Sequence, residues 1–275
     1  MLRLGIRVRR QVAELVLAEL LELAPSGVEE VALGEEIVEY AVFGAPGELP
    51  AVPDLTAAAG PALVDVRTTE IADDWAERWR EFHQPVVLDG RLTVRPPWEP
   101  PGHTPLDLVI DPGQAFGTGA HATTRLCLEL MLELPDAGGP FLDLGCGSGV
   151  LAIAAARLGY APVLALDNDP ASISATNENA DRNGVAVDAR RHDLRTGELP
   201  TARTVAANLL GPLLLGLAQR LPDHRRASER MIVSGVLAGE ASKVAAAFAS
   251  RGLVETRRRS DGEWVALLLA VNVDS

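Results

Sequence analysis

The stretch PFLDLGCGSGVLAIAAA, residues 140–156, constrains the fold more than any other part of this 275-residue sequence. Apolar residues typical of a buried strand run into Gly145, Gly147 and Gly149, and an alanine-rich helix is expected to follow directly. Glycine lets the backbone turn sharply and lets a ligand approach without a clash against Cβ. The free N–H groups at the start of a helix favour a carboxylate or a phosphate. We therefore expect a strand–loop–helix unit that holds a cofactor.

This loop is compatible with NAD, FAD or S-adenosylmethionine. The dinucleotide fingerprint, G-x-G-x-x-G, needs a glycine where this chain has Val150. Asp167 ends the next expected strand, 22 positions after Gly145, where a carboxylate can accept hydrogen bonds from both hydroxyls of a ribose. Together with Asp143 and the three glycines, Asp167 is typical of a class I methyltransferase that uses S-adenosylmethionine and releases S-adenosylhomocysteine.

Other residues near the loop have weaker signals. Asn168 stands at the end of the same strand and is a further candidate for cofactor binding. Asp193 follows the third expected strand, where it is placed near an adenine amino group, or it is simply a carboxylate of a surface loop. Asp169 before Pro170 is typical of the start of a helix. Cys146 is expected to be a small packing side chain.

From about Leu106 onward, strand-like and helix-like segments alternate, which indicates a mostly parallel sheet covered by helices on both faces. Helices are expected to begin near Ser148, Pro170, Pro212 and Ala238. The last two strands follow each other without a helix, so the sheet should end in an antiparallel hairpin. We expect a Rossmann-like seven-stranded sheet in a catalytic domain of residues 105–275. Its candidate strands are PFLDLG, VLALD, VDARRH, TVAANLL, RMIVSG, LVETRRR and WVALLLA.

The first 70 residues have a different order of segments, β-α-β-β-α-β, which is that of a ferredoxin-like α+β sandwich. The second helix of this order, PDLTAAAG, is only weakly marked. Residues 71–104 are expected to be a linker. It contains a helix, DDWAERWREF, whose aromatic side is typical of packing, and the proline-rich stretch RPPWEPPGHTP. The expected domains are therefore residues 1–70 and 105–275.

The composition argues against several classes of protein. A net charge of −13 disfavours a nucleic acid as the direct partner and suits either a basic protein partner or solubility alone. No apolar run approaches the ~20 residues that span a bilayer, and the N-terminus does not have the pattern of a secretory signal. Cys127 and Cys146 form no C-x-x-C pair, so we expect no metal site, and the expected location is a reducing cytoplasm.

The fourth expected strand of the sheet is followed by AANLLGPL. Methyltransferases acting on amide or base nitrogen often have N-P-P-Y here. Asn208 is present, but Leu209 and Leu210 replace the prolines, which argues against a glutamine amide or a DNA adenine as substrate. The side-chain oxygen of Asn208 is suited to accept a hydrogen bond from an amine. Alternatively, Asn208 caps the helix that begins near Pro212.

Several segments together resemble the PrmA family, whose members methylate large-subunit ribosomal protein eleven. The resemblance implies S-adenosylmethionine-dependent trimethylation of the α-amine and lysine ε-amines of that protein. It also implies cofactor contacts at Thr124, Gly145, Asp167 and Asn208, an N-terminal domain that recognises the substrate protein, and a flexible linker. The segments are DPGQAFGTGAHATTRLCLELM, LDLGCGSGVLAIAAARLG, LDNDPASISATNENADRNGV, AANLLGPLLLGLA, SGVL and GEWVALLL, with DDWAERWREFHQPV upstream.

We expect the segment FGTGAHATT to cover the methionine end of the cofactor and to wall a channel for the amine. Phe116 is the expected apolar wall, and Thr118, His121 and Thr123 are expected to make polar contacts. His121 either accepts the proton of the amine or only starts a helix. A dedicated base is not required if burial beside a sulfonium lowers the pKa of the amine.

Two alternatives stay open at this point. The first is a methyltransferase for another protein lysine or for a small amine. The second is a non-catalytic, cofactor-binding module for ribosome assembly. In either case we expect a monomer.

Overall fold

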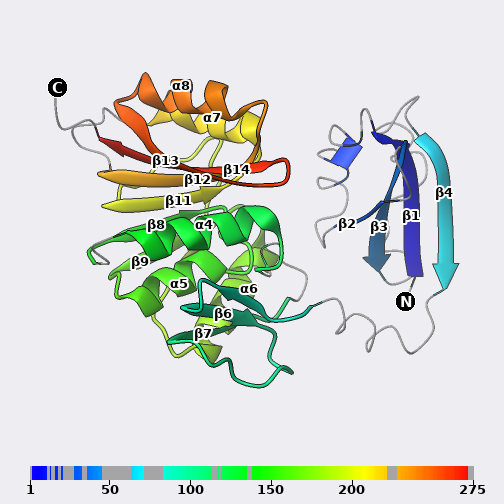
Figure 1. Cartoon of the computed structure of the whole chain (residues 1–275), viewed down its shortest axis with the longest axis horizontal. Coiled ribbons are helices and arrows are strands. Elements are labelled where there is room, and N and C mark those ends of the chain that lie inside the picture. Colours follow the sequence, from blue (N-terminus) through cyan, green and yellow to red (C-terminus); the bar gives the residue numbers. More distant parts are fainter. Residues whose placement is uncertain are drawn as a thin grey trace. The chain divides into compact units, whose positions relative to one another are not determined.

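The computed structural model describes residues 2–10, 13, 16–17, 20, 28–32, 36–44, 63–70, 83–112, 117, 119–134, 138–221 and 228–271. The chain forms two compact units, residues 1–82 and 83–275 (Figure 1). The expected helix of residues 73–82 and the weak helix of residues 53–60 lie outside the described residues.

The N-terminal unit contains a four-stranded antiparallel sheet in the order β2-β3-β1-β4. The strands are β1 (Leu2–Arg9), β2 (Glu29–Ala32), β3 (Ile37–Gly44) and β4 (Leu63–Glu70). Alternate residues of β1, including Ile6, pack with the helical residues Val16 and Leu20 in one core. Two-residue alternation on the strand and three- to four-residue spacing on the helix place these side chains on facing surfaces. This is the strand order of the expected ferredoxin-like sheet.

The second unit is built on a seven-stranded sheet in the order β10-β9-β8-β11-β12-β14-β13. Its parallel strands are β8 (Phe141–Leu144), β9 (Val163–Asp167), β10 (Asp188–Arg191), β11 (Thr204–Asn208) and β12 (Arg230–Leu237). β13 (Leu253–Asp261) and β14 (Trp264–Val271) form the terminal antiparallel hairpin, and β14 also pairs with β12. The seven expected strands and the hairpin are confirmed.

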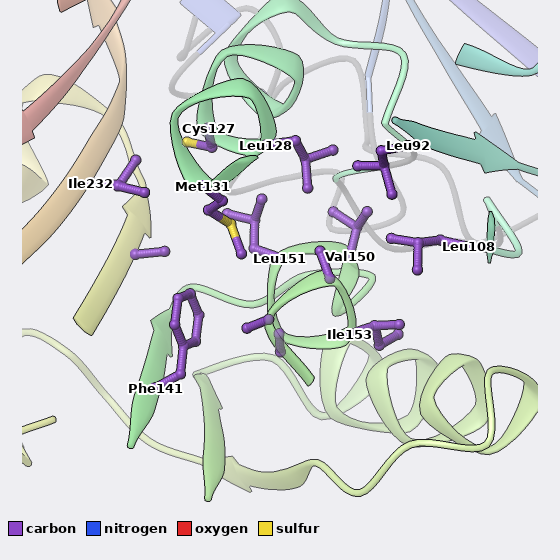
Figure 2. Packing of buried hydrophobic residues seen from close by; sticks show 14 of the residues in the cluster. Leu92, Leu108, Cys127, Leu128, Met131, Phe141, Val150, Leu151, Ile153 and Ile232 are labelled. Carbon is purple, nitrogen blue, oxygen red and sulfur yellow. The ribbon is translucent and has the colours of Figure 1, made fainter. Parts of the chain in front are cut away.

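Helices cover both faces of this sheet (Figure 1). α4 (Ala122–Glu133) and α5 (Val150–Leu158) pack on one face, and α7 (Gly211–Arg220) and α8 (Ala241–Ala249) pack on the other. α6 (Pro170–Arg182) follows β9. Successive side chains of β8 point to opposite faces of the sheet. Phe141 therefore belongs to the α4–α5 core and Leu142 to the α7–α8 core. Figure 2 shows Phe141 in the first core together with Met131 of α4 and Leu151 of α5.

Residues 83–104 are part of the second unit, so their assignment to a linker is corrected. β5 (Val86–Leu88), β6 (Leu92–Arg95) and β7 (Leu106–Val109) form a three-stranded sheet. The buried side chains of these short strands pack in the same core as α4 and α5, where Figure 2 shows Leu92 and Leu108 beside Val150. Arg95 and Asp107 bind each other at 2.9 Å, and they also bind the carbonyl of Glu99 and the N–H of Gly102. This ion pair organises the proline-rich stretch that reads as a linker in sequence.

Candidate active site

The glycine loop after β8 makes the turn that the sequence predicts. Gly145, Gly147 and Gly149 have φ angles of 77°, 53° and 81°, in the left-handed region that favours glycine. The N–H groups of Gly145 and Cys146 donate to the carbonyl of Leu166 at 2.8 and 3.1 Å, which ties the loop to β9. A Cβ on Gly149 would lie 2.8 Å from the side chain of Thr176. The loop therefore needs glycine at Gly149 for both its backbone conformation and its packing.

Asp167 lies at the carboxyl end of β9, beside this loop. One carboxylate oxygen accepts from the N–H of Gly147 and the other from the N–H of Asp169, both at 3.0 Å. Each oxygen keeps a further lone pair. Asp169 caps α6 by accepting from the N–H of Ala171 at 2.9 Å, as expected. Asp167 is thus held rigidly, with acceptor capacity left for a ligand.

Asp143 lies in β8 and is fully buried. Its Oδ2 accepts from the N–H of Ala152 at 3.1 Å, in the first turns of α5. Its Oδ1 has no hydrogen-bond partner among the described residues. Burial, with a smaller contribution from the charge of Asp167, raises the pKa of Asp143 to about 7, against the opposing hydrogen bond from Ala152. Asp143 therefore joins the end of β8 to the start of α5, the two elements that flank the glycine loop.

Cys146 is buried inside the loop, and its Sγ lies 3.3 Å from the hydroxyl oxygen of Thr176. Burial, followed by the nearby Asp143, raises the pKa of this thiol. The thiol is therefore protonated at neutral pH, in line with the expected packing role.

Asn208 ends β11 at the same edge of the sheet. Its Nδ2 donates to the hydroxyls of Thr123 and Thr124 on α4, at 3.2 and 3.3 Å. The expected alternative, that Asn208 caps α7, is wrong: the cap position of α7 is Leu210, and it makes no side-chain cap bond. Asn208 instead joins the end of the fourth parallel strand to the start of α4.

His121 is the cap residue of α4, so it does start a helix, and a part in catalysis stays a prediction. Its Nδ1 accepts from the N–H of Thr123 at 3.3 Å and lies 2.8 Å from the Thr123 hydroxyl. Because Nδ1 is an acceptor, the Thr123 hydroxyl donates its single proton to Nδ1. The hydroxyl oxygen can therefore only accept in its contact with Asn208. The amide nitrogen of Asn208 must then face Thr123, and its Oδ1 is directed elsewhere. Among the residues that the structure describes, Oδ1 of Asn208 accepts no hydrogen bond.

The ring of His121 also packs edge-on against Trp264, with ring centroids 5.2 Å apart. Burial, followed by the charge of Arg125, lowers the pKa of His121, so the ring is neutral at pH 7. Arg125 donates to Asp261 of the β13–β14 hairpin and to the carbonyl of Ala120. The hairpin therefore borders the site and fixes the start of α4.

The segment before α4 is described only in part, and Phe116 and Thr118 lie outside the described residues. The carbonyl of Gly117 accepts from the hydroxyl of Ser148 at 2.6 Å, so the two glycine-rich segments are in contact. Gly119 has a φ of 89°, and a Cβ there would lie 2.7 Å from the side chain of Val94. The segment before α4 and the loop after β8 therefore meet at Gly117 and Ser148.

Asp193 and Asn168 are the two remaining candidates for cofactor binding. Asp193 is half-buried, and its carboxylate accepts from the N–H of Arg195 at 2.9 Å. That backbone bond, against a small cost of burial and with help from the Arg195 guanidinium, lowers the pKa of Asp193. Asn168 is exposed, and its carbonyl accepts from Arg191 at 3.0 Å. Cofactor contacts of Asp193 and Asn168 stay predictions.

Three residues of the site are not among the site residues that the sequence predicts: Ser148, Thr176 and Asn179. Thr176 donates to the carbonyl of Gly147 at 3.0 Å, and Asn179 donates to the carbonyl of Ser148 at 2.9 Å. All three are buried. The available signal is the polar spacing along α6, where T-x-x-N continues into N-x-x-x-N. A buried helix face with polar residues at this spacing indicates contacts with backbone.

No group of three or more His, Cys, Asp or Glu side chains suited to a metal ion occurs in the described part of the chain. In the same ranges, no helix is long and apolar enough to cross a membrane.

The strand order, the glycine loop after the first parallel strand and the acidic residue after the second are those of the class I S-adenosylmethionine-dependent methyltransferase fold. The sequence model of the family "Ribosomal protein L11 methyltransferase (PrmA)" matches residues 51–271. The chain belongs to this family, which confirms the resemblance.

Relatives named ribosomal protein L11 methyltransferase come from several bacteria. That of Symbiobacterium thermophilum is 37% identical over 198 residues, covering 71% of this chain and 65% of the relative. That of Chloroflexus aurantiacus is 38% identical over 235 residues, covering 75% and 72%. That of Halorhodospira halophila is 42% identical over 195 residues, covering 70% and 66%. The chain thus spans about two thirds of the length of these relatives.

A solved structure gives the same fold. The crystal structure of ribosomal protein L11 methylase from Lactobacillus delbrueckii subsp. bulgaricus superimposes with a TM-score of 0.61 at 28% identity. The superposition covers 70% of this chain and 99% of that one.

Proposed function

We propose that this chain transfers methyl groups from S-adenosylmethionine to ribosomal protein L11, at its α-amine and at lysine ε-amines, up to the trimethyl level. The family and the names of the relatives support L11 as the substrate. The observation that carries the chemistry is the orientation of Asn208, whose Nδ2 is bound by Thr123 and Thr124. This leaves the amide oxygen as an acceptor for an amine N–H, at the edge of the sheet where the glycine loop lies.

The residues around the loop fit the cofactor. Asp167 has two fixed oxygens, each with a lone pair left, which is what the two hydroxyls of a ribose need. The three glycines have no Cβ and a left-handed φ, which allows a close approach of a ligand to the backbone at these positions. We assign cofactor contacts to these residues and to Thr124 and Asn208, with Asp143 beneath the loop and Asn168 and Asp193 beyond Asp167. When bound, S-adenosylmethionine supplies an electrophilic methyl group on a sulfonium.

The amine must be neutral to accept the methyl group. A lysine with the ordinary pKa of about 10.4 costs about 5 kcal/mol to deprotonate at pH 7. Burial beside a positive charge lowers that cost, since both effects disfavour the ammonium form. The oxygen of Asn208 then accepts an N–H of the neutral amine and orients its lone pair. Positioning of this kind is a large part of the rate enhancement in a displacement between bound groups.

A general base is not part of the proposal. His121 is neutral at pH 7, and its Nδ1 accepts a hydrogen bond from the N–H of Thr123. The proton of the ring is therefore on Nε2. We therefore propose that His121 orients Thr123, and through it Asn208. Phe116, Thr118 and Thr123 stay proposed as the walls and polar contacts of the amine channel.

The remaining proposals concern partners. We propose that the N-terminal unit recognises L11, that the net charge of −13 favours this basic partner, and that no nucleic acid binds directly. A monomer in the cytoplasm is the proposed state.

The proposal is tested by incubating the purified chain with radiolabelled S-adenosylmethionine and either purified L11 or bulk lysate proteins. Selective labelling of L11 supports it. Labelling of other proteins or of a small amine instead would support the first alternative. Tight cofactor binding without any labelling would support a non-catalytic ribosome-assembly module.

A further inference from the structure

Asn179 of α6 and Asn183, the C-cap residue of this helix, bind the free edge of β7 and the residues that follow it. β7 is the last strand of the sheet β5-β6-β7, so one of its edges presents unpaired backbone groups. Asn183 accepts from the N–H of Val109 at 2.9 Å and donates to its carbonyl at 2.7 Å. Asn179 accepts from the N–H of Asp111 at 2.9 Å. Four residues of a helix rise about 6 Å and two of a strand about 6.6 Å, so N-x-x-x-N matches this edge.

Asn179 also reaches the cofactor loop. Its Oδ1 is bound to Asp111, and its Nδ2 donates to the carbonyl of Ser148 at 2.9 Å. The hydroxyl of Ser148 donates in turn to the carbonyl of Gly117 at 2.6 Å. Asp111 and Gly117 both belong to the segment DPGQAFGTGAHATTR. Both are connected to Ser148, Asp111 through Asn179 and Gly117 directly.

The hydrogen bonds of Ser148 and Asn179 are buried. Ser148 is 0% exposed and Asn179 is 1% exposed, so water does not compete for their polar atoms. Arg182 closes the arrangement, because it donates to Oδ1 of Asn179 at 3.1 Å and pairs with Asp111 at 3.2 Å. A buried donor or acceptor that loses its partner carries the full cost of its desolvation.

We propose that Ser148 and Asn179 are positioning residues that couple the cofactor loop to the start of α4. A ligand that fixes the loop fixes the hydroxyl of Ser148, and with it Gly117. The chain leads from Gly117 through Gly119 to His121 and Thr123, which orient Asn208. The catalytic readout of this proposal rests on the proposed function, but the coupling itself does not.

Two variants break the connection at different bonds. Ser148→Ala removes the hydroxyl that binds Gly117 and keeps the carbonyl that Asn179 binds. Asn179→Asp keeps an oxygen for the N–H of Asp111, but its second oxygen cannot donate to the carbonyl of Ser148. Asn177→Ala is the matched control, because Asn177 lies on the exposed side of the same helix.

The first readout is hydrogen exchange at Gly119, Ala120 and His121, with and without S-adenosylhomocysteine. In the parent chain, the ligand is expected to slow exchange at these amides. In Ser148→Ala and Asn179→Asp this slowing is expected to fall at least fivefold, while the dissociation constant of the ligand, measured by calorimetry, changes less than about threefold. Asn177→Ala is expected to behave like the parent chain.

The second readout is methyl transfer to L11. Both variants are expected to lower kcat about tenfold with little change in the KM for S-adenosylmethionine, because the amine side of the site is displaced and the cofactor loop keeps its own contacts. In the double variant, the combined loss is expected to be smaller than the product of the single losses, since both residues act through one connection.

The proposal is overturned if Ser148→Ala matches Asn177→Ala in both ligand-dependent exchange and kcat, or if the two losses multiply. If Ser148→Ala does not fold, Asn179→Asp carries the same comparison. If the parent chain does not methylate L11, the proposed function fails, and the exchange measurement still decides the coupling.

Discussion

Replacing Asp143 with asparagine is expected to make the chain more stable at high pH than at low pH, relative to the parent. The asparagine side chain mimics the neutral acid, since it keeps an oxygen for the N–H of Ala152 and places a donor where Oδ1 lies. Burial is the largest cause of the pKa of about 7, which compares with an ordinary value of 3.8. The folded chain therefore holds a proton here at a pH where the unfolded chain has lost it.

The direction and size of the effect follow from this difference. A raised pKa gives stability that is fully present below pH 3.8 and is lost as the pH rises through about 7. Each pH unit in that window is worth about 1.4 kcal/mol. Between pH 5 and pH 8 the free energy of unfolding of the parent chain is thus expected to fall by about 3 kcal/mol through Asp143 alone.

The assay is urea unfolding of the parent chain and of Asp143→Asn at several pH values. The advantage of the variant should grow by about 3 kcal/mol from pH 5 to pH 8 and then level off. Asp188→Asn is the control, since Asp188 is exposed beside Arg190, which lowers its pKa, and its effect should be flat above pH 5. A pH-independent advantage for Asp143→Asn, or one that shrinks with rising pH, would refute the reasoning.

Asn208→Ala is expected to lower kcat/KM for L11 about tenfold, which is the effect of losing one hydrogen bond in the transition state. Steady-state rates equal to those of the parent chain would show that Asn208 is not part of the amine site. His121→Ala is expected to lower kcat only about threefold, since the ring orients rather than accepts a proton; a loss of a hundredfold or more in single-turnover assays would indicate a general base. Gly149→Ala is expected to cost about 2 kcal/mol or more in urea unfolding, because φ is 81° and Thr176 occupies the space for Cβ. An unchanged unfolding midpoint for Gly149→Ala would contradict the account of the loop.

Features that one short stretch of sequence determines are predicted well. The glycine loop, Asp167 and the cap at Asp169 all follow from local rules, in which a strand ends, a turn needs positive φ and a helix needs an acceptor. The hairpin at the end of the sheet is similar, because two strands joined by a turn of two residues have to be antiparallel neighbours. Sequence alone therefore predicts the local geometry of the proposed cofactor loop.

Features that depend on distant partners are not predicted. The connection from Asn179 to Asp111 joins residues 68 positions apart, and nothing near Asn179 in the sequence indicates its partner. Residues 83–104 read as a linker because their strands have only three or four residues and their prolines suggest irregular chain. Their burial against α4 and α5, and the pair Arg95–Asp107, become evident only in the fold.

The most direct test of the central claim is the mass of L11 after incubation with the purified chain and S-adenosylmethionine. The account predicts whole-methyl increments at the α-amine and at lysine side chains, reaching trimethylation, and much slower modification by Asn208→Ala. An unchanged mass of L11, at cofactor concentrations that saturate the chain, would contradict it.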